Sequence, residues 1–205
     1  MVQRWREVLF LHWPVDASEL RALIPRPLEL DTFEGQAWLG IVPFRMEGVR
    51  FRGLPPFPGT GAFPELNVRT YVKHQGKSGV WFFSLDAASA LAVAAARAWF
   101  GLPYFYARMS SRRIGDEVAY RSQRRPKGAH FEGRYRPVGD AAPAADGTLE
   151  HWLVERYCLF AKKGQRILIG ELFKIGDALA ALLKLTPERF DLLHQLHDIS
   201  TTSDS

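Results

Sequence analysis

The stretch ELNVRTYVK at residues 65–73 decides the fold, because its side chains alternate in character without a break. This period of two predicts a β-strand, since successive side chains of a strand point to opposite sides of its sheet. One side would hold the apolar set Leu66, Val68, Thr70 and Val72, and the other side the polar set Glu65, Asn67, Arg69, Tyr71 and Lys73.

Two arrangements of this strand are open. In the first, the apolar set lies in the core and the polar set in water, as in an ordinary amphipathic strand. In the second, Glu65, Asn67, Arg69 and Tyr71 line an enclosed space, and the apolar set is covered by outer elements. We favour the second, because Asn67 and Tyr71 are not typical of a solvated face.

The segments on either side of this strand predict further strands and few helices. Residues 80–85 are bulky on both faces, which is typical of a central strand. Asp86 is expected to cap a helix over residues 87–100 that Gly101 and Pro103 end. Other strands are expected over residues 36–44, 104–111, 118–124, 130–137, 152–161 and 166–175. Other helices are expected over 17–24, behind the Asp16–Glu19 capping box, and over 177–185, with a loop at 52–64 and a frayed end at 200–205.

The order of these elements predicts an α+β fold that is mainly β. Strands do not alternate regularly with helices, which excludes a doubly wound parallel sheet. The 13 prolines and 17 glycines are typical of many turns between short strands. With 205 residues the chain is expected to form a single domain over residues 1–205, built on a curved antiparallel sheet or barrel that encloses a pocket.

Several classes of protein are excluded by what the sequence lacks. The single cysteine, Cys158, leaves no internal disulfide framework and no multi-cysteine metal site. No GxSxG, HExxH or P-loop motif occurs, so we expect neither a metal nor a cofactor. The N-terminus lacks a signal-peptide run, and the most apolar stretch, residues 87–100, is too short to span a membrane and contains Arg97. A cytoplasmic protein without a membrane partner is therefore expected.

The net charge of +5 is concentrated in one region. Residues 97–136 hold ten arginines and lysines against three acidic residues. Such a region could attract nucleic acid. It carries no known nucleic-acid-binding signature, however, and we interpret it as a solvated sheet face and loop.

Three groups of residues are candidates for a site. They are the polar strand face, the segment from Arg97 to Arg108, and Glu155-Arg156-Tyr157. The candidate acid or base residues are Glu65, Tyr104 and Glu155, because carboxyl and phenol groups transfer protons. The candidate ligand-binding residues, which would hold an anion or donate hydrogen bonds, are Asn67, Arg69, Tyr71, Arg97, Arg108 and Tyr157. His12 is interpreted as a hydrogen-bonded packing residue.

Several blocks resemble one bacterial family. They are FLHWPVD (10–16), LIPRPLELDTFEGQAWLGIVPFRM (23–46), FPELNVRTYV (63–72), GVWFFSLDA (79–87), ARAWFGLPYFYARM (96–109) and ERYCLFA (155–161). In this order they resemble the YqjF-like proteins, domain-of-unknown-function family 2071, over roughly residues 5–171. The resemblance implies an acetoacetate-decarboxylase-like fold, an open antiparallel β-barrel with a central pocket and flanking helices. It implies no established activity.

The same resemblance allows a comparison of chemistry. Acetoacetate decarboxylases carry a G-x-P-K-K segment whose lysine forms a Schiff base, and the similar segment here is Gly101-Leu102-Pro103-Tyr104-Phe105. A phenol cannot form an imine, because Schiff-base chemistry requires an amine. Acetoacetate decarboxylation is therefore disfavoured.

These observations predict that the protein has a pocket for a small organic ligand. It would act as a lyase, hydratase or cyclase without a Schiff base, on an anionic or carbonyl compound. The alternatives are a noncatalytic binding or structural protein and a nucleic-acid-binding protein. The ligand, the reaction and the oligomeric state stay open, and a homo-oligomer is compatible with the sequence.

Overall fold

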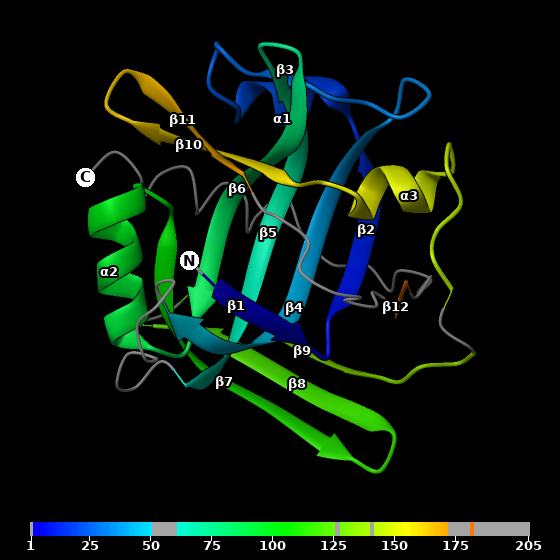
Figure 1. Cartoon of the computed structure of the whole chain (residues 1–205), viewed down its shortest axis with the longest axis vertical. Helices are drawn as coiled ribbons and strands as arrows, with labels where there is room; N and C mark the ends of the chain where they lie inside the picture. The colour runs from blue at the N-terminus through cyan, green and yellow to red at the C-terminus, as the bar shows by residue number, and fades with distance from the viewer. Residues whose placement is uncertain (1, 51–60, 126–127, 140–141, 172–180, 183–205) are drawn as a thin grey trace.

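The computed structural model of the protein describes residues 2–50, 61–125, 128–139, 142–171 and 181–182 (Figure 1). The helices are α1 (Ala17–Ala22), α2 (Ala90–Phe100) and α3 (Leu149–Val154). The first strands are β1 (Val2–Arg6), β2 (Leu9–Val15), β3 (Glu29–Leu30), β4 (Ala37–Arg50), β5 (Ala62–His74) and β6 (Lys77–Ala87). The later strands are β7 (Tyr104–Ile114), β8 (Glu117–Arg124), β9 (His130–Tyr135), β10 (Cys158–Lys163), β11 (Arg166–Glu171) and β12 (Ala181–Leu182).

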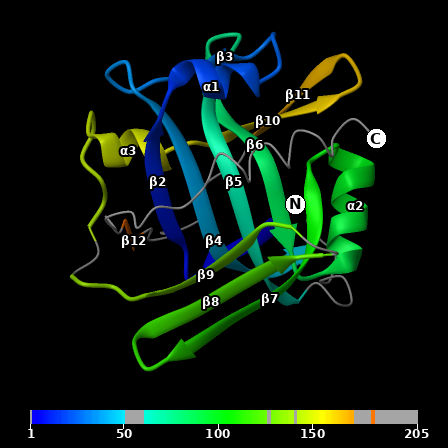
Figure 2. The same ribbon diagram turned by 180° about the vertical axis from the view of Figure 1, so that it is seen from behind.

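The strands form one curled sheet, so the prediction of a mainly β fold is confirmed. Its path runs β2-β4-β5-β6-β7-β8-β9, and most neighbours on that path are antiparallel. The exception is the parallel pair β6–β7, which α2 connects. The prediction of a mainly antiparallel sheet is thus confirmed, although β10 also pairs with β6 in parallel and β12 with β2. Figure 2 shows the β7–β9 ribbon crossing the other strands at one end of the sheet.

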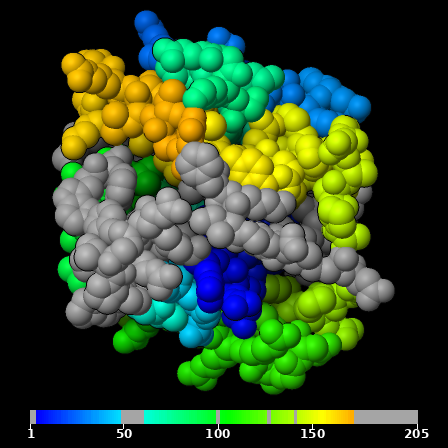
Figure 3. All heavy atoms as spheres, in the orientation of Figure 1, coloured from blue at the N-terminus to red at the C-terminus, as the bar shows by residue number. Residues whose placement is uncertain are grey.

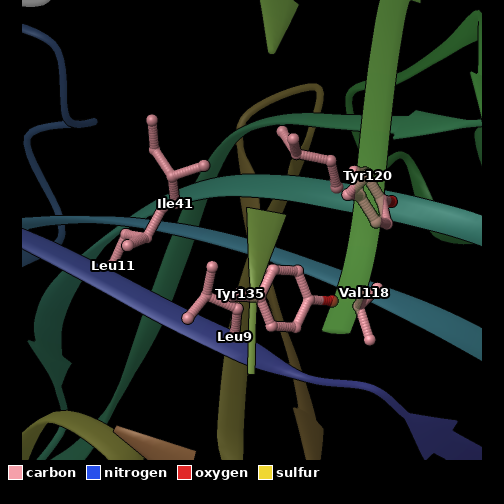
Figure 4. Close-up of a cluster of buried hydrophobic side chains, with 7 residues drawn as sticks. Leu9, Leu11, Ile41, Val118, Tyr120 and Tyr135 are labelled. Carbon is pink, nitrogen blue, oxygen red and sulfur yellow. The ribbon is translucent and has the colours of Figure 1, made fainter. Parts of the chain in front are cut away.

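One face of the sheet, called here the outer face, packs against that ribbon. It carries Leu66, whose cluster with Leu9, Leu11 and Ile41 meets residues of β8 and β9 (Figure 4). The ribbon contributes Val118, Tyr120 and Tyr135. The Tyr120 hydroxyl also donates a hydrogen bond of 2.7 Å to the Glu65 carbonyl oxygen, which fixes the ribbon to β5.

The opposite face, called here the inner face, is also covered. Phe10, Val42 and Phe44 cluster there with Val93 of α2, and Tyr71, Val80 and Phe82 cluster with Leu153 of α3. Figure 1 shows α3 and β10 lying across this side of the sheet, and Figure 3 shows their atoms (yellow to orange) side by side on the surface. Both faces of β5 are therefore buried.

The start of α2 differs from the prediction. Its N-cap is Ser89, whose hydroxyl accepts from the Ala92 amide, and not Asp86. Strand β6 continues through Asp86, because this residue and Ala87 still pair with β5. The end of the helix is as predicted, since Gly101 is its C-cap with φ at +63°.

The strand predicted over residues 152–161 was also wrong in its first half. Residues 149–154 form α3 instead, capped by the Thr148 hydroxyl, which accepts from the His151 amide. Strand β10 begins only at Cys158, so Glu155 and Tyr157 lie in the connection before it.

Two other predictions meet the limits of the described residues. The loop predicted at 52–64 lies mainly outside them, and its last residues already belong to β5, which begins at Ala62. The helix predicted at 177–185 is contradicted at Ala181–Leu182, which pair with β2 as a strand. The rest of that segment and residues 200–205 lie outside the described residues.

Gly79 lies where β10 pairs with β6. A Cβ atom at this position would lie 2.5 Å from the Cys158 carbonyl oxygen and 2.7 Å from the Phe160 ring. We expect Gly79→Ala to lower the free energy of unfolding by about 1–3 kcal/mol, because overpacked sites force backbone shifts. Urea denaturation measures the loss. The control is Gly61→Ala, where a Cβ atom would meet nothing within 4 Å. Equal effects at the two positions would contradict the close contact of Gly79 with β10.

Candidate functional site

A row of buried polar side chains follows β5 along the inner face. The exposed fractions are 2% for Glu65, 1% for Asn67, 4% for Arg69 and 0% for Tyr71. Lys73, the next residue in the alternation, is exposed. The polar row is thus buried between the sheet and the elements that cover it, and not in water as in the first arrangement considered from the sequence.

Arg69 is a buried cation without a carboxylate partner in the described part of the chain. Its Nη2 donates a hydrogen bond of 3.3 Å to the Leu153 carbonyl oxygen, and its Nε has no hydrogen-bond partner. The guanidinium carbon lies 5.3 Å from the centroid of the Phe10 ring. A buried charge costs free energy unless it is paired. A bound anion would therefore stabilise Arg69 more than any other group at this site.

His12 and Tyr71 form a hydrogen-bonded pair beside Arg69. The His12 Nε2 and the Tyr71 hydroxyl are 2.6 Å apart, and the hydroxyl donates to the Leu153 carbonyl oxygen at 3.0 Å. Burial, helped by the charge of Arg69, lowers the pKa of His12 to about 3. His12 is therefore neutral at physiological pH, so the only cation of this group is Arg69.

Glu65 and Tyr104 form a second pair at the other end of the row. The Tyr104 hydroxyl lies 3.2 Å from both carboxyl oxygens of Glu65. The parallel pairing of β7 with β6 brings Tyr104 to this place, opposite Leu85. Burial raises the pKa of Glu65 to about 8, although the hydrogen bond from Tyr104 opposes the rise. Glu65 therefore holds a proton near neutral pH, as a general acid must.

Asn67 and Trp38 add two more polar atoms without partners. Neither the Asn67 Oδ1 nor the Trp38 Nε1 has a hydrogen-bond partner among the described residues. Trp38 of β4 packs against the cluster that contains Tyr71. Buried polar atoms in proteins are nearly always hydrogen-bonded. With the Arg69 Nε, the row thus offers two donors and one acceptor to a bound molecule.

The remaining residues predicted for the site lie elsewhere. Arg97 is exposed, and its Nε donates to the Tyr104 carbonyl oxygen at 2.6 Å. Arg108 is exposed on β7, opposite Gln123. Tyr157, 38% exposed, donates to the Glu155 carboxylate in the connection after α3. The structure brings together Glu65, Asn67, Arg69, Tyr71 and Tyr104. The other four predicted residues, Arg97, Arg108, Glu155 and Tyr157, lie away from this group.

One ionic network near the site was missed by sequence reasoning. The Asp31 carboxylate, 1% exposed, contacts Arg156 Nη1 and Lys73 Nζ, each at 2.8 Å. The Arg156 guanidinium also stacks on Trp152, 4.2 Å from its ring centroid. We call these contacts the Asp31 clamp. Asp31 and Arg156 are 125 positions apart, so no local pattern could have revealed their contact.

The basic region forms part of the exposed β7–β9 ribbon. Arg121 pairs with Glu132 at 2.7 Å, and Arg136 lies 3.5 Å from Asp116. Arg124, in contrast, is buried against Asp86. Part of the excess charge is thus neutralised within the protein.

Two classes of feature are absent from the described residues. They contain no group of three or more histidine, cysteine, aspartate or glutamate side chains that could hold a metal ion. None of the helices in the described ranges is both long enough and apolar enough to cross a membrane.

Comparison with known proteins places these residues in a family. The profile of the DUF2071 family, described as an uncharacterised conserved protein, matches residues 2–173. Over 161 residues the chain is 53% identical to the uncharacterised protein YqjF of Bacillus subtilis (strain 168). This match covers 78% of the chain and 66% of YqjF, so the chain spans just under two thirds of that relative.

Solved structures show the same fold at low sequence identity. The acetoacetate decarboxylase of Legionella pneumophila is similar with a TM-score of 0.56 and 15% identity, over 78% of this chain and 58% of that enzyme. The enduracididine biosynthesis enzyme MppR, solved in complex with pyruvate, is similar with a TM-score of 0.51 and 12% identity, over 79% of this chain and 65% of that enzyme. The expected acetoacetate-decarboxylase-like fold is thereby confirmed.

Proposed function

The chain belongs to the DUF2071 family, and from its own inner-face residues we propose that it binds a small carboxylate that also carries a carbonyl group. In this proposal it acts on that compound without a Schiff base. The observation that carries the proposal is Arg69, a buried cation with no carboxylate partner among the described residues. An organic anion would supply the missing charge. The pyruvate bound to the structurally similar enzyme MppR is a compound of this class.

The other residues of the row take complementary roles in this proposal. Arg69 binds the carboxylate, and the Asn67 Oδ1 and Trp38 Nε1, which lack partners among the described residues, orient the rest of the molecule. Glu65, with the hydroxyl of Tyr104, supplies a proton, because burial keeps its pKa near 8. A buried proton donor, Glu65, together with an anion-binding residue, Arg69, is compatible with a lyase, hydratase or cyclase.

A Schiff base at the decarboxylase position does not fit this chain. Tyr104 follows Gly101-Leu102-Pro103, where the similar decarboxylase segment carries a lysine. All lysines in the described ranges, Lys73, Lys77, Lys162 and Lys163, have exposed side chains. A Schiff-base lysine is activated by burial in an apolar pocket, which these exposed amines lack.

Borohydride trapping tests the chemistry. We expect that reduction in the presence of acetoacetate or pyruvate leaves the mass of the protein unchanged, because no amine stands at the position of Tyr104. Intact-protein and peptide mass spectrometry measure the result. A substoichiometric adduct spread over many lysines also fits the proposal, whereas a stoichiometric adduct on one lysine, such as Lys73 or Lys77, would replace it by Schiff-base catalysis.

Ligand binding tests the role of Arg69. We expect Arg69→Met to weaken the binding of pyruvate or acetoacetate tenfold or more, because a hydrogen bond to a charged group contributes about 1.5–3 kcal/mol. The melting temperature should stay the same or rise, since no described carboxylate loses its partner. Calorimetry and thermal denaturation measure the two effects. The matched control is Arg108→Met on the exposed surface, which should change neither.

The two measurements also separate the proposal from its noncatalytic rival. If Arg69 has a purely structural role, Arg69→Met lowers the melting temperature and no carboxylate binds the wild-type protein. If the protein binds without catalysis, the wild-type protein and Glu65→Gln bind the probes alike and neither promotes exchange of their carbon-bound protons with D2O. Catalysis predicts exchange by the wild-type protein alone, which proton NMR detects.

A further inference from the structure

The carbonyl oxygen of Leu153 lies against the polar row of β5. Two donors converge on it, the Arg69 Nη2 at 3.3 Å and the Tyr71 hydroxyl at 3.0 Å. Leu153 is near the C-terminal end of α3 and is 2% exposed. A carbonyl oxygen carries only a partial charge, so it compensates a buried guanidinium less well than a carboxylate does.

From this convergence we propose that a ligand carboxylate binds Arg69 and Tyr71 in exchange for the Leu153 carbonyl oxygen. The α3 segment, residues 148–157, must then detach from the inner face before the ligand can enter. This inference rests on the proposed function and adds how the site is opened. The inner-face site is thus closed by an internal competitor rather than standing open to solvent.

The Asp31 clamp holds the α3 segment in its closed position. Asp31 directly follows β3, and its carboxylate forms an ion pair with Arg156 near the end of the segment. The same carboxylate forms a second ion pair with Lys73. Trp152 of the same segment packs on Tyr71 with ring centroids 4.7 Å apart. Since these contacts and the Leu153 carbonyl oxygen belong to one short segment, breaking the clamp makes the release of Arg69 less costly.

A population argument turns this geometry into a measurable effect. If only the detached state binds ligand, the apparent Kd equals the intrinsic Kd divided by the fraction of molecules in that state. Weakening the clamp raises this fraction and therefore tightens binding. A substitution outside the ligand's contacts is thus expected to improve affinity, an effect that a purely structural clamp would not produce.

The test compares the full-length protein with its Asp31→Asn variant, using pyruvate and acetoacetate as probes. Asparagine keeps the shape of Asp31 but removes the charge that holds Arg156 and Lys73. We expect the apparent Kd to fall several-fold in Asp31→Asn, and amide hydrogen exchange in residues 148–157 to become faster. In the wild-type protein a saturating probe should also speed exchange in this segment, and in Arg69→Met it should not. The control is Glu132→Gln, which removes an exposed ion pair with Arg121 and should change neither quantity.

The outcomes separate this inference from the function on which it rests. If a probe binds the wild-type protein while exchange in residues 148–157 slows or stays constant, the displacement of the Leu153 carbonyl is wrong and the proposed function stands. If Asp31→Asn binds the probe more weakly, the clamp does not compete with the ligand and the inference is likewise overturned. If neither protein binds either probe although exchange is faster in Asp31→Asn, both proposals fail.

Discussion

The free energy of unfolding of the wild-type protein is expected to fall by about 5 kcal/mol between pH 4.5 and pH 9 because of Glu65, and Glu65→Gln is expected to abolish this fall. The pKa of Glu65 is raised by burial from 4.5 to about 8. The folded state therefore holds the proton more tightly than the unfolded state does. The stabilisation is complete below pH 4.5 and is lost as the pH rises through 8, because the folded protein must then bury a charge.

Urea denaturation of both proteins at several pH values measures this effect. Glutamine does not titrate, and its side-chain oxygen can still accept the hydrogen bond of Tyr104. All other titrating groups, including His12, are common to the two proteins and cancel in the difference. The difference in the free energy of unfolding should therefore change with pH in favour of Glu65→Gln. Parallel curves from pH 4.5 to pH 9 would show that Glu65 is ionised in the folded protein.

Arg124→Met is expected to lower the free energy of unfolding by about 3–5 kcal/mol near neutral pH, because it leaves a buried charge unpaired. The Arg124 Nε and Nη2 donate to the same oxygen of Asp86 at 3.0 and 2.7 Å. The side chains are 10% and 3% exposed, so solvent screens the pair little. The guanidinium also lies 4.1 Å from the centroid of the Phe105 ring.

Two further variants make this prediction specific. Arg121→Met breaks an exposed pair on the same strand and should cost less than about 1 kcal/mol. Replacing both Asp86 and Arg124 by apolar residues of similar size should recover much of the loss, since the orphaned charge disappears. The loss in Arg124→Met should also shrink in acid, because burial already raises the pKa of Asp86 and Arg124 opposes the rise. Equal losses in the two arginine variants would contradict the prediction.

The parts of the fold that could be predicted are those with a local signal. The alternation in residues 65–73 gave β5 and the composition of its two faces, and Gly101 gave the end of α2. The strands predicted over 104–111 and 118–124 likewise correspond to β7 and β8. Each of these features depends on residues within a few positions of one another, which is the range over which periodicity and turn chemistry act.

The parts that could not be predicted depend on distant partners. Asp86 has the residue type of a helix cap, and only its pairing with β5 and Arg124 keeps it in a strand. The α3 segment contains Trp152, Val154 and Tyr157, which are residue types common in strands, and tertiary packing decides between strand and helix. The candidate site was predicted where it follows β5, at Glu65, Asn67, Arg69 and Tyr71. Its covering residues Trp152 and Leu153 were not predicted, and Arg156 was a candidate without its partner Asp31, because these contacts are long-range.

The late position of α3 in the chain has a consequence for biosynthesis. Strands β2 to β7 have been synthesised once residue 114 is made, but the segment that covers Arg69 and Tyr71 begins only at residue 148. At about 5–20 residues per second, the nascent sheet exists for seconds with its inner face open. During that interval the polar row of β5 is hydrated, which spares the nascent chain a fully apolar surface that would favour aggregation. The residues that bear the candidate chemistry thus also make this face of the sheet less apolar until α3 is made.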